Sequence, residues 1–203
     1  MAPEPLILLV PTAEDNMGKW CLAVASVAAE VRLLSQCDLI TLAGLVDDVH
    51  SCKLALHAIV EAVDVGSICA QCGGDCCRTG KYHFTVVDLL VYLLKEKELF
   101  TPRFDRDLCP YLGQTGCLMP PGFRPFTCVI FNCEKVDDLL DEPQRKDLHC
   151  LEGKLRELYG RVEELLQGRF MAGLLMNCER DLIRNGSTIL RNRKSTGGFN
   201  GRD

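Results

Sequence analysis

The chain has 203 residues, of which 47% are hydrophobic and 25% are charged, and its formal net charge is −5. This composition is typical of a globular protein with a core of its own and excludes a disordered chain. The negative charge argues against a general nucleic-acid binder, because such proteins hold phosphate with clustered Lys and Arg.

The cysteine content has to be interpreted together with the cellular compartment. Residues 6–10 form the only apolar run near the N-terminus, and this run is too short for a secretory signal. No stretch approaches the roughly 20 apolar residues that cross a bilayer. We therefore expect a cytoplasmic protein with no membrane partner, whose thiols stay reduced. The 13 cysteines are also an odd number, so they cannot all pair within the chain, and disulfides are the disfavoured alternative.

The first third of the chain predicts an arm followed by helices. Residues 1–16 contain three prolines, which favour an extended arm, with 6–10 as a short edge strand. Residues 17–66 predict a helical hairpin. Its first helix spans 19–34, and its second begins near Asp38, breaks near Gly44 and ends at Gly66. The cysteines of this hairpin are expected to be small buried hydrophobic residues outside any site; they are Cys21, Cys37 and Cys52.

Residues 67–135 form the cysteine-rich region. Within it, 81–84 predicts a short strand, and Thr85 with Asp88 has the spacing of a capping box for a helix over 86–98. The glycines and prolines after residue 108 leave little room for regular structure. A bound metal would stabilise such a stretch, because metal-binding energy becomes folding energy.

The last third predicts a second helical hairpin, over 136–185. A helix begins at Asp141 or Glu142 before Pro143 and carries an apolar stripe, for which packing within the chain is favoured over dimerisation. A second helix spans about 169–184, and Cys150 and Cys178 on these helices are interpreted as structural. Residues 186–203 form a basic tail, for which a mobile terminus is favoured over a docking arm.

The fold class that follows is mainly α. Helical hairpins flank a loop-rich, cysteine-ligated metal-binding core with little β structure, within one compact domain. Eight cysteines make up the candidate metal ligands, of which a subset would bind: Cys69, Cys72, Cys76, Cys77, Cys109, Cys117, Cys128 and Cys133. Thiolates at short spacing suit zinc or an iron–sulfur cluster. His83 is interpreted as a strand residue rather than a ligand.

Two details favour iron and sulfur over zinc. Cys109 is followed by Pro110, as in the Cys-Pro that closes bacterial ferredoxin motifs. The neighbouring residues are apolar and aromatic and would shield a cluster; they are Tyr111, Leu112, Leu118, Phe123, Phe126 and Phe131. An iron–sulfur cluster, of the 4Fe–4S type, is therefore favoured, and Zn²⁺ is the alternative. One site and two sites both remain open.

The cysteine pattern resembles a known family. The matching pieces are Cys69-x-x-Cys72-x-x-x-Cys76-Cys77-Arg78, the helix start at Thr85 and Asp88, Cys109-Pro110-Tyr111-Leu112, Gly116-Cys117, Arg124-Pro125-x-x-Cys128 and Cys133. This arrangement is similar to the bacterial CxxCxxxCC proteins, described as zinc- or iron-chelating, and to the cysteine domain of flagellin lysine N-methylases. The resemblance covers about a third of the chain and implies metal binding.

Three functions compete at this point. The first is an iron–sulfur protein with a redox or binding role and an unidentified protein or redox partner. The second is a zinc-stabilised interaction module. The third, implied by the resemblance alone, is an S-adenosylmethionine-dependent protein lysine N-methyltransferase-like enzyme, although the glycine-rich nucleotide signature is missing. Arg78 and Arg124 are candidates to bind an anion or tune the charge of a cluster, and a salt bridge or hydrogen bonds to loop carbonyls are the equal alternative.

Overall fold

The computed structural model describes residues 15–72, 80–105, 108–113 and 116–190, and at positions 69, 70, 72 and 116 it describes the backbone. The predicted arm and edge strand, and most of the basic tail, lie outside these residues. The described α-helices are α1 (Asn16–Val31), α2 (Gln36–Glu61), α3 (Val65–Cys72), α4 (Val86–Leu94), α5 (Phe126–Ile130), α6 (Glu134–Asp137), α7 (Glu142–Leu166) and α8 (Leu174–Asn177). The shorter elements are the 3₁₀ helices η2 (Gly80–Tyr82) and η3 (Pro121–Phe123), the π-helix η4 (Cys178–Arg184), and the strands β1 (Leu112–Gly113) and β2 (Gly116–Cys117). The mainly α prediction is confirmed.

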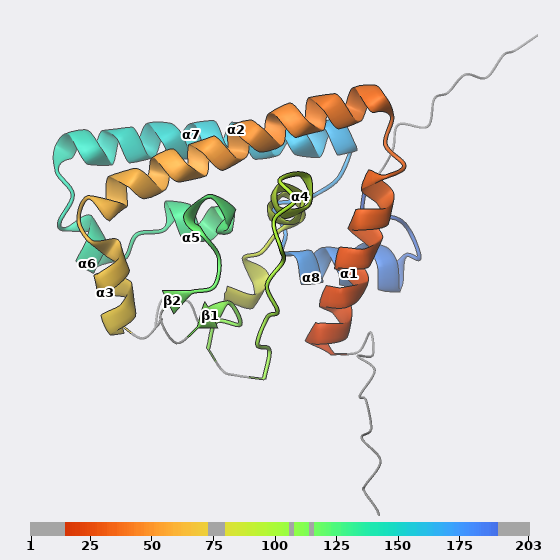
Figure 1. The fold of residues 1–203 in the computed structure, drawn as a ribbon, viewed down its shortest axis with the longest axis horizontal. Helices are drawn as coiled ribbons and strands as arrows, with labels where there is room; N and C mark the ends of the chain where they lie inside the picture. Colours follow the sequence, from red (N-terminus) through yellow and green to blue (C-terminus); the bar gives the residue numbers. More distant parts are fainter. Residues whose placement is uncertain (1–14, 73–79, 106–107, 114–115, 191–203) are drawn as a thin grey trace, which may run out of the picture.

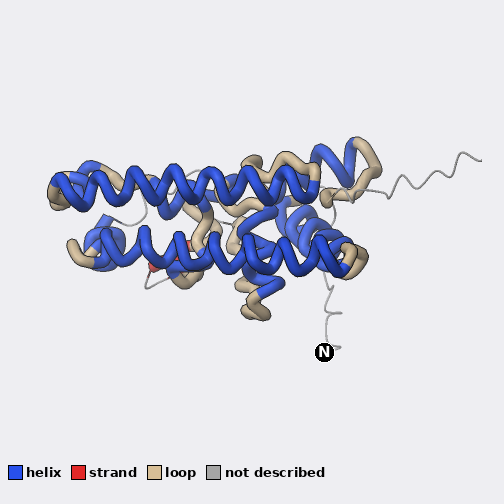
Figure 2. The backbone as a smooth tube through the Cα atoms, turned by 90° about the horizontal axis from the view of Figure 1, so that it is seen from above, coloured by secondary structure: helices blue, strands red, loops and turns tan. Residues whose placement is uncertain are grey.

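Two long helices, α2 and α7, lie side by side and form one layer of the molecule (Figures 1 and 2). Their shared face is apolar and buried at Leu45, Val49 and Leu56 of α2 and at Leu155 and Val162 of α7. Burying each such side chain stabilises the fold by roughly 1.5–3 kcal/mol. The predicted stripe of α7 therefore packs within the chain, as expected.

The shorter elements form a second layer beneath this pair (Figure 1). One end of the layer holds α3, α6, α5 and the two strands, and the other holds α1, α8 and η4. Helix α4 lies between them and is buried from Val86 to Tyr92. One hydrophobic core joins both layers.

Side-chain caps begin the four longest described α-helices, α1, α2, α4 and α7. Thr85 and Asp88 form the predicted capping box of α4. Asp141 caps α7 in a second box with Gln144, and Pro143 stands in its first turn. Ser35 caps α2 by accepting from the Asp38 amide at 3.1 Å. These side chains satisfy amides that have no partner within the helix.

Several predicted boundaries are wrong. Helix α2 runs through Gly44 without a break, and Gly66 lies inside α3 rather than ending a helix. Asp64 separates α2 from α3, in the left-handed conformation (φ 56°) that Asp tolerates better than most residues. Glu96, with φ 50°, follows the end of α4, so that helix is shorter than the predicted 86–98.

Two predictions of element type are also wrong. Residues 81–84 form no strand, because η2 occupies 80–82 and only Thr85 makes an isolated bridge, to Gly173. The predicted helix over 169–184 is divided into α8 and the π-helix η4.

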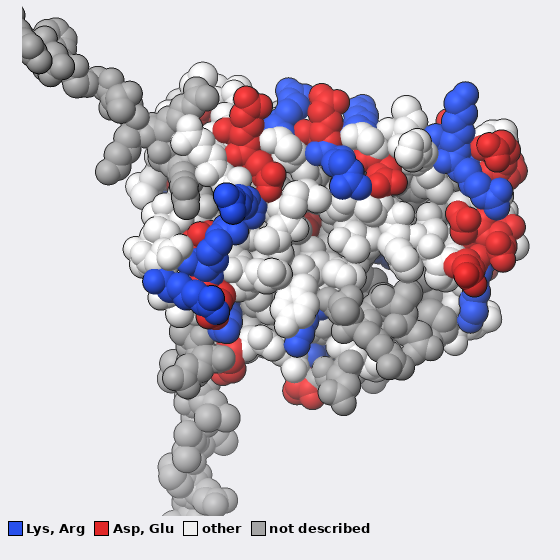
Figure 3. Space-filling model, turned by 180° about the vertical axis from the view of Figure 1, so that it is seen from behind, with Lys and Arg blue, Asp and Glu red and all other residues white. Residues whose placement is uncertain are grey.

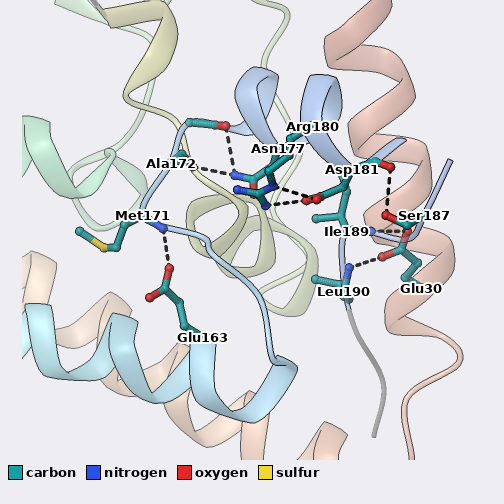
Figure 4. Close-up of polar contacts among 11 residues, drawn as sticks. Glu30, Glu163, Met171, Ala172, Asn177, Arg180, Asp181, Ser187, Ile189 and Leu190 are labelled. Carbon is teal, nitrogen blue, oxygen red and sulfur yellow. Dashed lines mark hydrogen bonds and ion pairs between the residues drawn. The ribbon is translucent and has the colours of Figure 1, made fainter. Parts of the chain in front are cut away.

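The C-terminal part of the described chain is held by polar contacts to α1 (Figure 4). The Glu30 carboxylate, 8% exposed, accepts the amides of Ile189 (3.2 Å) and Leu190 (2.5 Å). Asp181 accepts two hydrogen bonds from Arg180, at 2.8 and 2.6 Å. Residues 189–190 are thereby fixed in the core beside α1, immediately before the tail.

Candidate metal centre

The structure spreads the eight candidate cysteines over several elements. Positions 69 and 72 lie one turn apart near the end of α3, and Cys76, Cys77 and Arg78 lie outside the described residues. The other four lie in the loop before β1 (Cys109), in β2 (Cys117), in α5 (Cys128) and at the N-cap of α6 (Cys133).

Packing brings these elements to one end of the molecule. Helix α3 packs against both β2 and α6 (Figure 1). Strands β1 and β2 pair antiparallel, with Leu112 opposite Cys117. Cys133 lies against a small apolar cluster formed by Val60, Val65 and Val136. The backbone carrying Cys69 and Cys72 is thus adjacent to the elements that carry Cys117 and Cys133.

Cys128 lies beside a histidine. Its Sγ is 3.4 Å from Nδ1 of His83, which follows the η2 turn. Burial lowers the pKa of His83, and the negative charge of Asp88 opposes this effect. The neutral imidazole is therefore favoured, and this is the form that binds metals. The sequence disfavours His83 as a ligand because eight cysteines lie in the same region, and it indicates a strand residue instead.

Cys109 is buried against the same turn. It is 7% exposed, and a Cβ added at Gly80 would overlap its sulfur. Glycine at position 80 therefore allows the η2 turn and Cys109 to approach closely. The Tyr111 hydroxyl donates to the Lys81 carbonyl at 3.3 Å, which fixes the other side of the turn.

Two buried tyrosines, Tyr111 and Tyr92, have raised pKa values. Burial raises the pKa of Tyr111, and the charges of Cys109 and Cys128 raise it further. Burial likewise raises the pKa of Tyr92, with Cys117 as the next cause. Among the described residues, the buried Tyr92 hydroxyl has no hydrogen-bond partner, which leaves a donor available to a sulfur acceptor.

The residues expected to shield a cluster differ in burial. Tyr111 and Phe126 are buried, and Tyr111 packs against Phe84 and Phe100 with ring centroids 5.9 and 5.3 Å apart. Phe131 is 56% exposed and Leu118 is 38% exposed. Their role as a shield stays a prediction.

The structure describes only one of the two candidate arginines. Arg78 lies outside the described residues. Arg124 donates from Nε to the Met119 carbonyl at 3.3 Å, which matches the hydrogen-bonding alternative. Its proposed role toward an anion or a cluster stays a prediction.

The cysteines outside the candidate set divide into two groups. Cys52 and Cys178 are buried, as expected of structural residues. Cys21 and Cys37 are exposed, so the prediction of burial is wrong for both, and Cys150 is exposed as well. The helix faces that carry Cys21 and Cys37 point away from the core, which the periodicity alone did not reveal.

A buried ionic cluster near this region escaped sequence reasoning. The Lys53 Nζ lies 2.6 Å from Oδ1 of Asp88, and neither side chain is exposed. The Tyr159 hydroxyl donates to the same oxygen at 2.6 Å. The backbone amide and hydroxyl of Thr85 donate to Oδ2 of Asp88 at 2.8 and 2.7 Å. A lysine within the apolar positions of α2 was the available signal.

Thiol and imidazole donors suit soft or borderline metals. Within residues 15–72, 80–105, 108–113 and 116–190, no group of three His, Cys, Asp or Glu side chains is arranged to hold a metal ion. A complete set would draw on cysteines beyond these ranges. Cys128 and His83 supply one sulfur and one nitrogen at close range.

The outer surface offers no extended basic face in the view of Figure 3. Lys and Arg alternate with Asp and Glu along the edge of the molecule, and the centre of this face carries few charges. No described helix is both long and apolar enough to pass through a membrane. Comparisons with protein-family models, curated proteins and solved structures found no match for the chain.

Proposed function

We propose that residues 69–133 hold a metal centre ligated by cysteines, with a 4Fe–4S cluster favoured, and that the protein has a redox or binding role. The observation that carries the proposal is the packing of α3, which bears Cys69 and Cys72, against β2, which bears Cys117, and against α6, which Cys133 precedes. Soft thiolate ligands select zinc and iron–sulfur clusters over hard cations.

The surroundings of Cys109 support a cluster. Cys109 belongs to the same hydrophobic core as Tyr111 and Phe84, and Phe100 packs against this core. Exclusion of water and hydrogen bonds to sulfur are two means by which proteins tune such clusters. Among the described residues the buried Tyr92 hydroxyl has no hydrogen-bond partner, so it is a candidate donor of this kind.

Structural zinc is the second candidate, and the 3.4 Å separation of Cys128 Sγ and His83 Nδ1 favours it over a cluster held by cysteines alone. Zinc sites often combine Cys sulfur with His nitrogen in tetrahedral geometry. In that case the metal would stabilise the loop-rich region, and the function would lie in surface contacts.

Metal analysis of anaerobically purified protein distinguishes these candidates. Iron, zinc and acid-labile sulfide are measured on one sample together with its visible absorption spectrum. The proposal expects a coloured protein with matching iron and sulfide. A colourless protein with stoichiometric zinc would replace the cluster with the zinc candidate, and a protein without either metal would refute both.

Variants identify the ligands. Cys109→Ser and Cys128→Ser are expected to lower the metal content. Cys21→Ser and Cys150→Ser are matched controls, because both of these cysteines are exposed and lie outside the candidate set. Equal metal content in all four variants would contradict the assignment of the site.

A further inference from the structure

We propose that His83 is a metal ligand, binding through Nδ1 beside the sulfur of Cys128. This inference rests on the proposed metal centre and adds a nitrogen donor to a set that the sequence described as cysteine alone. It is based on the geometry of the His83–Cys128 pair and on the contacts that fix both residues.

The distance between the two atoms suits a shared ion. With a metal–sulfur bond of about 2.3 Å and a metal–nitrogen bond of about 2.05 Å at the tetrahedral angle, sulfur and nitrogen lie about 3.6 Å apart. The observed separation of Sγ and Nδ1 is 3.4 Å. An ion could therefore bind both atoms after shifts of only a few tenths of an ångström.

The backbone around His83 is held on both sides. The His83 amide donates to the Gly80 carbonyl at 2.9 Å, which closes the η2 turn. On the C-terminal side, Phe84 is buried and its carbonyl accepts the Leu174 amide at 2.6 Å. Gly173 packs so closely on Tyr82 that a Cβ there would overlap the Tyr82 carbonyl. The imidazole thus extends from a fixed segment.

Cys128 is fixed as well. It lies in α5, which follows Pro125, and its amide donates to the Pro125 carbonyl at 2.9 Å. Phe126 in the same turn is buried and packs on Tyr159, with ring centroids 5.1 Å apart. Both donors therefore extend from backbone that the core already orders, as a metal ligand requires.

A nitrogen ligand changes the properties of the centre. Replacing a thiolate by neutral imidazole removes one negative charge from the site. In iron–sulfur proteins such a replacement raises the reduction potential. His83 would accordingly make a cluster here easier to reduce than one held by cysteines alone.

The first test needs no variant. The full-length protein is labelled with ¹⁵N-histidine, stripped of metal and loaded with Zn²⁺, and the imidazole nitrogens are observed by NMR. We expect Nδ1 of His83 to show the shift of a metal-bound nitrogen and Nε2 to carry the proton. If the purified protein holds a paramagnetic cluster, pulsed EPR on the same labelled protein is expected to show a directly bonded nitrogen.

The second test uses His83→Gln, His83→Cys and the exposed control His149→Gln. Competition with a chromophoric chelator measures Zn²⁺ affinity. His83→Gln should weaken binding by more than the roughly tenfold loss that follows removal of an outer-shell partner. His83→Cys should retain metal, and its Co²⁺-loaded form should gain sulfur-to-cobalt charge-transfer absorption. His149→Gln should match the wild type.

The outcomes separate this inference from the proposed function. Metal-loaded wild type without metal-bound histidine nitrogen, together with unchanged affinity in His83→Gln, would overturn the inference and leave the cysteine centre standing. This result would identify the pair as a thiol–imidazole hydrogen bond. A wild-type protein that binds neither zinc nor iron would overturn both.

Discussion

Replacing Lys53 with methionine is expected to destabilise the protein by about 3 kcal/mol. Methionine keeps the apolar stem of the side chain and removes its charge, which leaves Asp88 without its cation. Removing one partner of a buried ion pair costs about 3–5 kcal/mol, because the remaining charge is uncompensated. Both side chains here are 0% exposed.

We expect a loss of stability at the lower end of that range, because Asp88 keeps its other hydrogen-bond partners. Its carboxylate still accepts from the Tyr159 hydroxyl and from the amide and hydroxyl of Thr85. These three donors continue to stabilise the negative charge after Lys53 is removed. By contrast, Lys95 and Asp47 form an exposed pair, 35% and 63% accessible, at a similar distance of 2.8 Å. Exposed pairs contribute at most about 1 kcal/mol.

Urea unfolding of Lys53→Met and Lys95→Met, at matched metal content, measures both effects. We expect a clearly lower midpoint for Lys53→Met, with an unchanged slope, and a midpoint close to the wild type for Lys95→Met. Equal losses below about 1 kcal/mol in both variants would refute this expectation. That result would mean that the buried pair recovers little more than its desolvation cost.

Three further predictions concern the packing at Gly80, the contact of Glu30 with residues 189–190, and pH. Gly80→Ala should lower the stability and the metal content of the protein, because the added Cβ would overlap the Cys109 sulfur. The control is Gly160→Ala, at an exposed helical position, which should stabilise the protein by about 0.5–1 kcal/mol in thermal unfolding. Glu30→Ala should speed hydrogen exchange of the Ile189 and Leu190 amides, which donate to the Glu30 carboxylate. Unchanged exchange would mean that Glu30 does not hold this segment against α1. Burial raises the pKa of Cys178 from 9.0 to about 11, so the unfolded chain releases this proton first. The free energy of unfolding should therefore fall between pH 9 and 11, less steeply in Cys178→Ala.

The helices with local signals could be predicted from the sequence. The capping boxes that begin α4 and α7 use residues only three positions apart, and the stripe of α7 repeats at helical spacing. Such features depend on neighbours in the chain, so the residues alone determine them. The mainly α architecture followed from the same signals.

The rest depended on contacts between distant segments. Gly66 carries the sequence signal of a helix end, yet α3 forms around it because the turn occurs at Asp64 and α3 then packs on α6 and β2. The contact of His83 with Cys128 joins residues 45 positions apart. No local pattern records such a pairing, because the η2 turn that creates it depends on Cys109 and Gly173 packing on either side.

The buried carboxylate of Asp88 connects the framework of the fold to the candidate site. One of its oxygens binds Lys53 of α2 and Tyr159 of α7, and the other accepts two hydrogen bonds from Thr85. Thr85 lies two residues after His83, so the same side chain joins both long helices to the segment that presents the imidazole. An apolar cluster could fill this space, but it would leave the capping amide of Thr85 without an acceptor. The polar network therefore determines the position of residues 83–85 as well as contributing to stability, and it does so where the proposed ligand requires a fixed backbone.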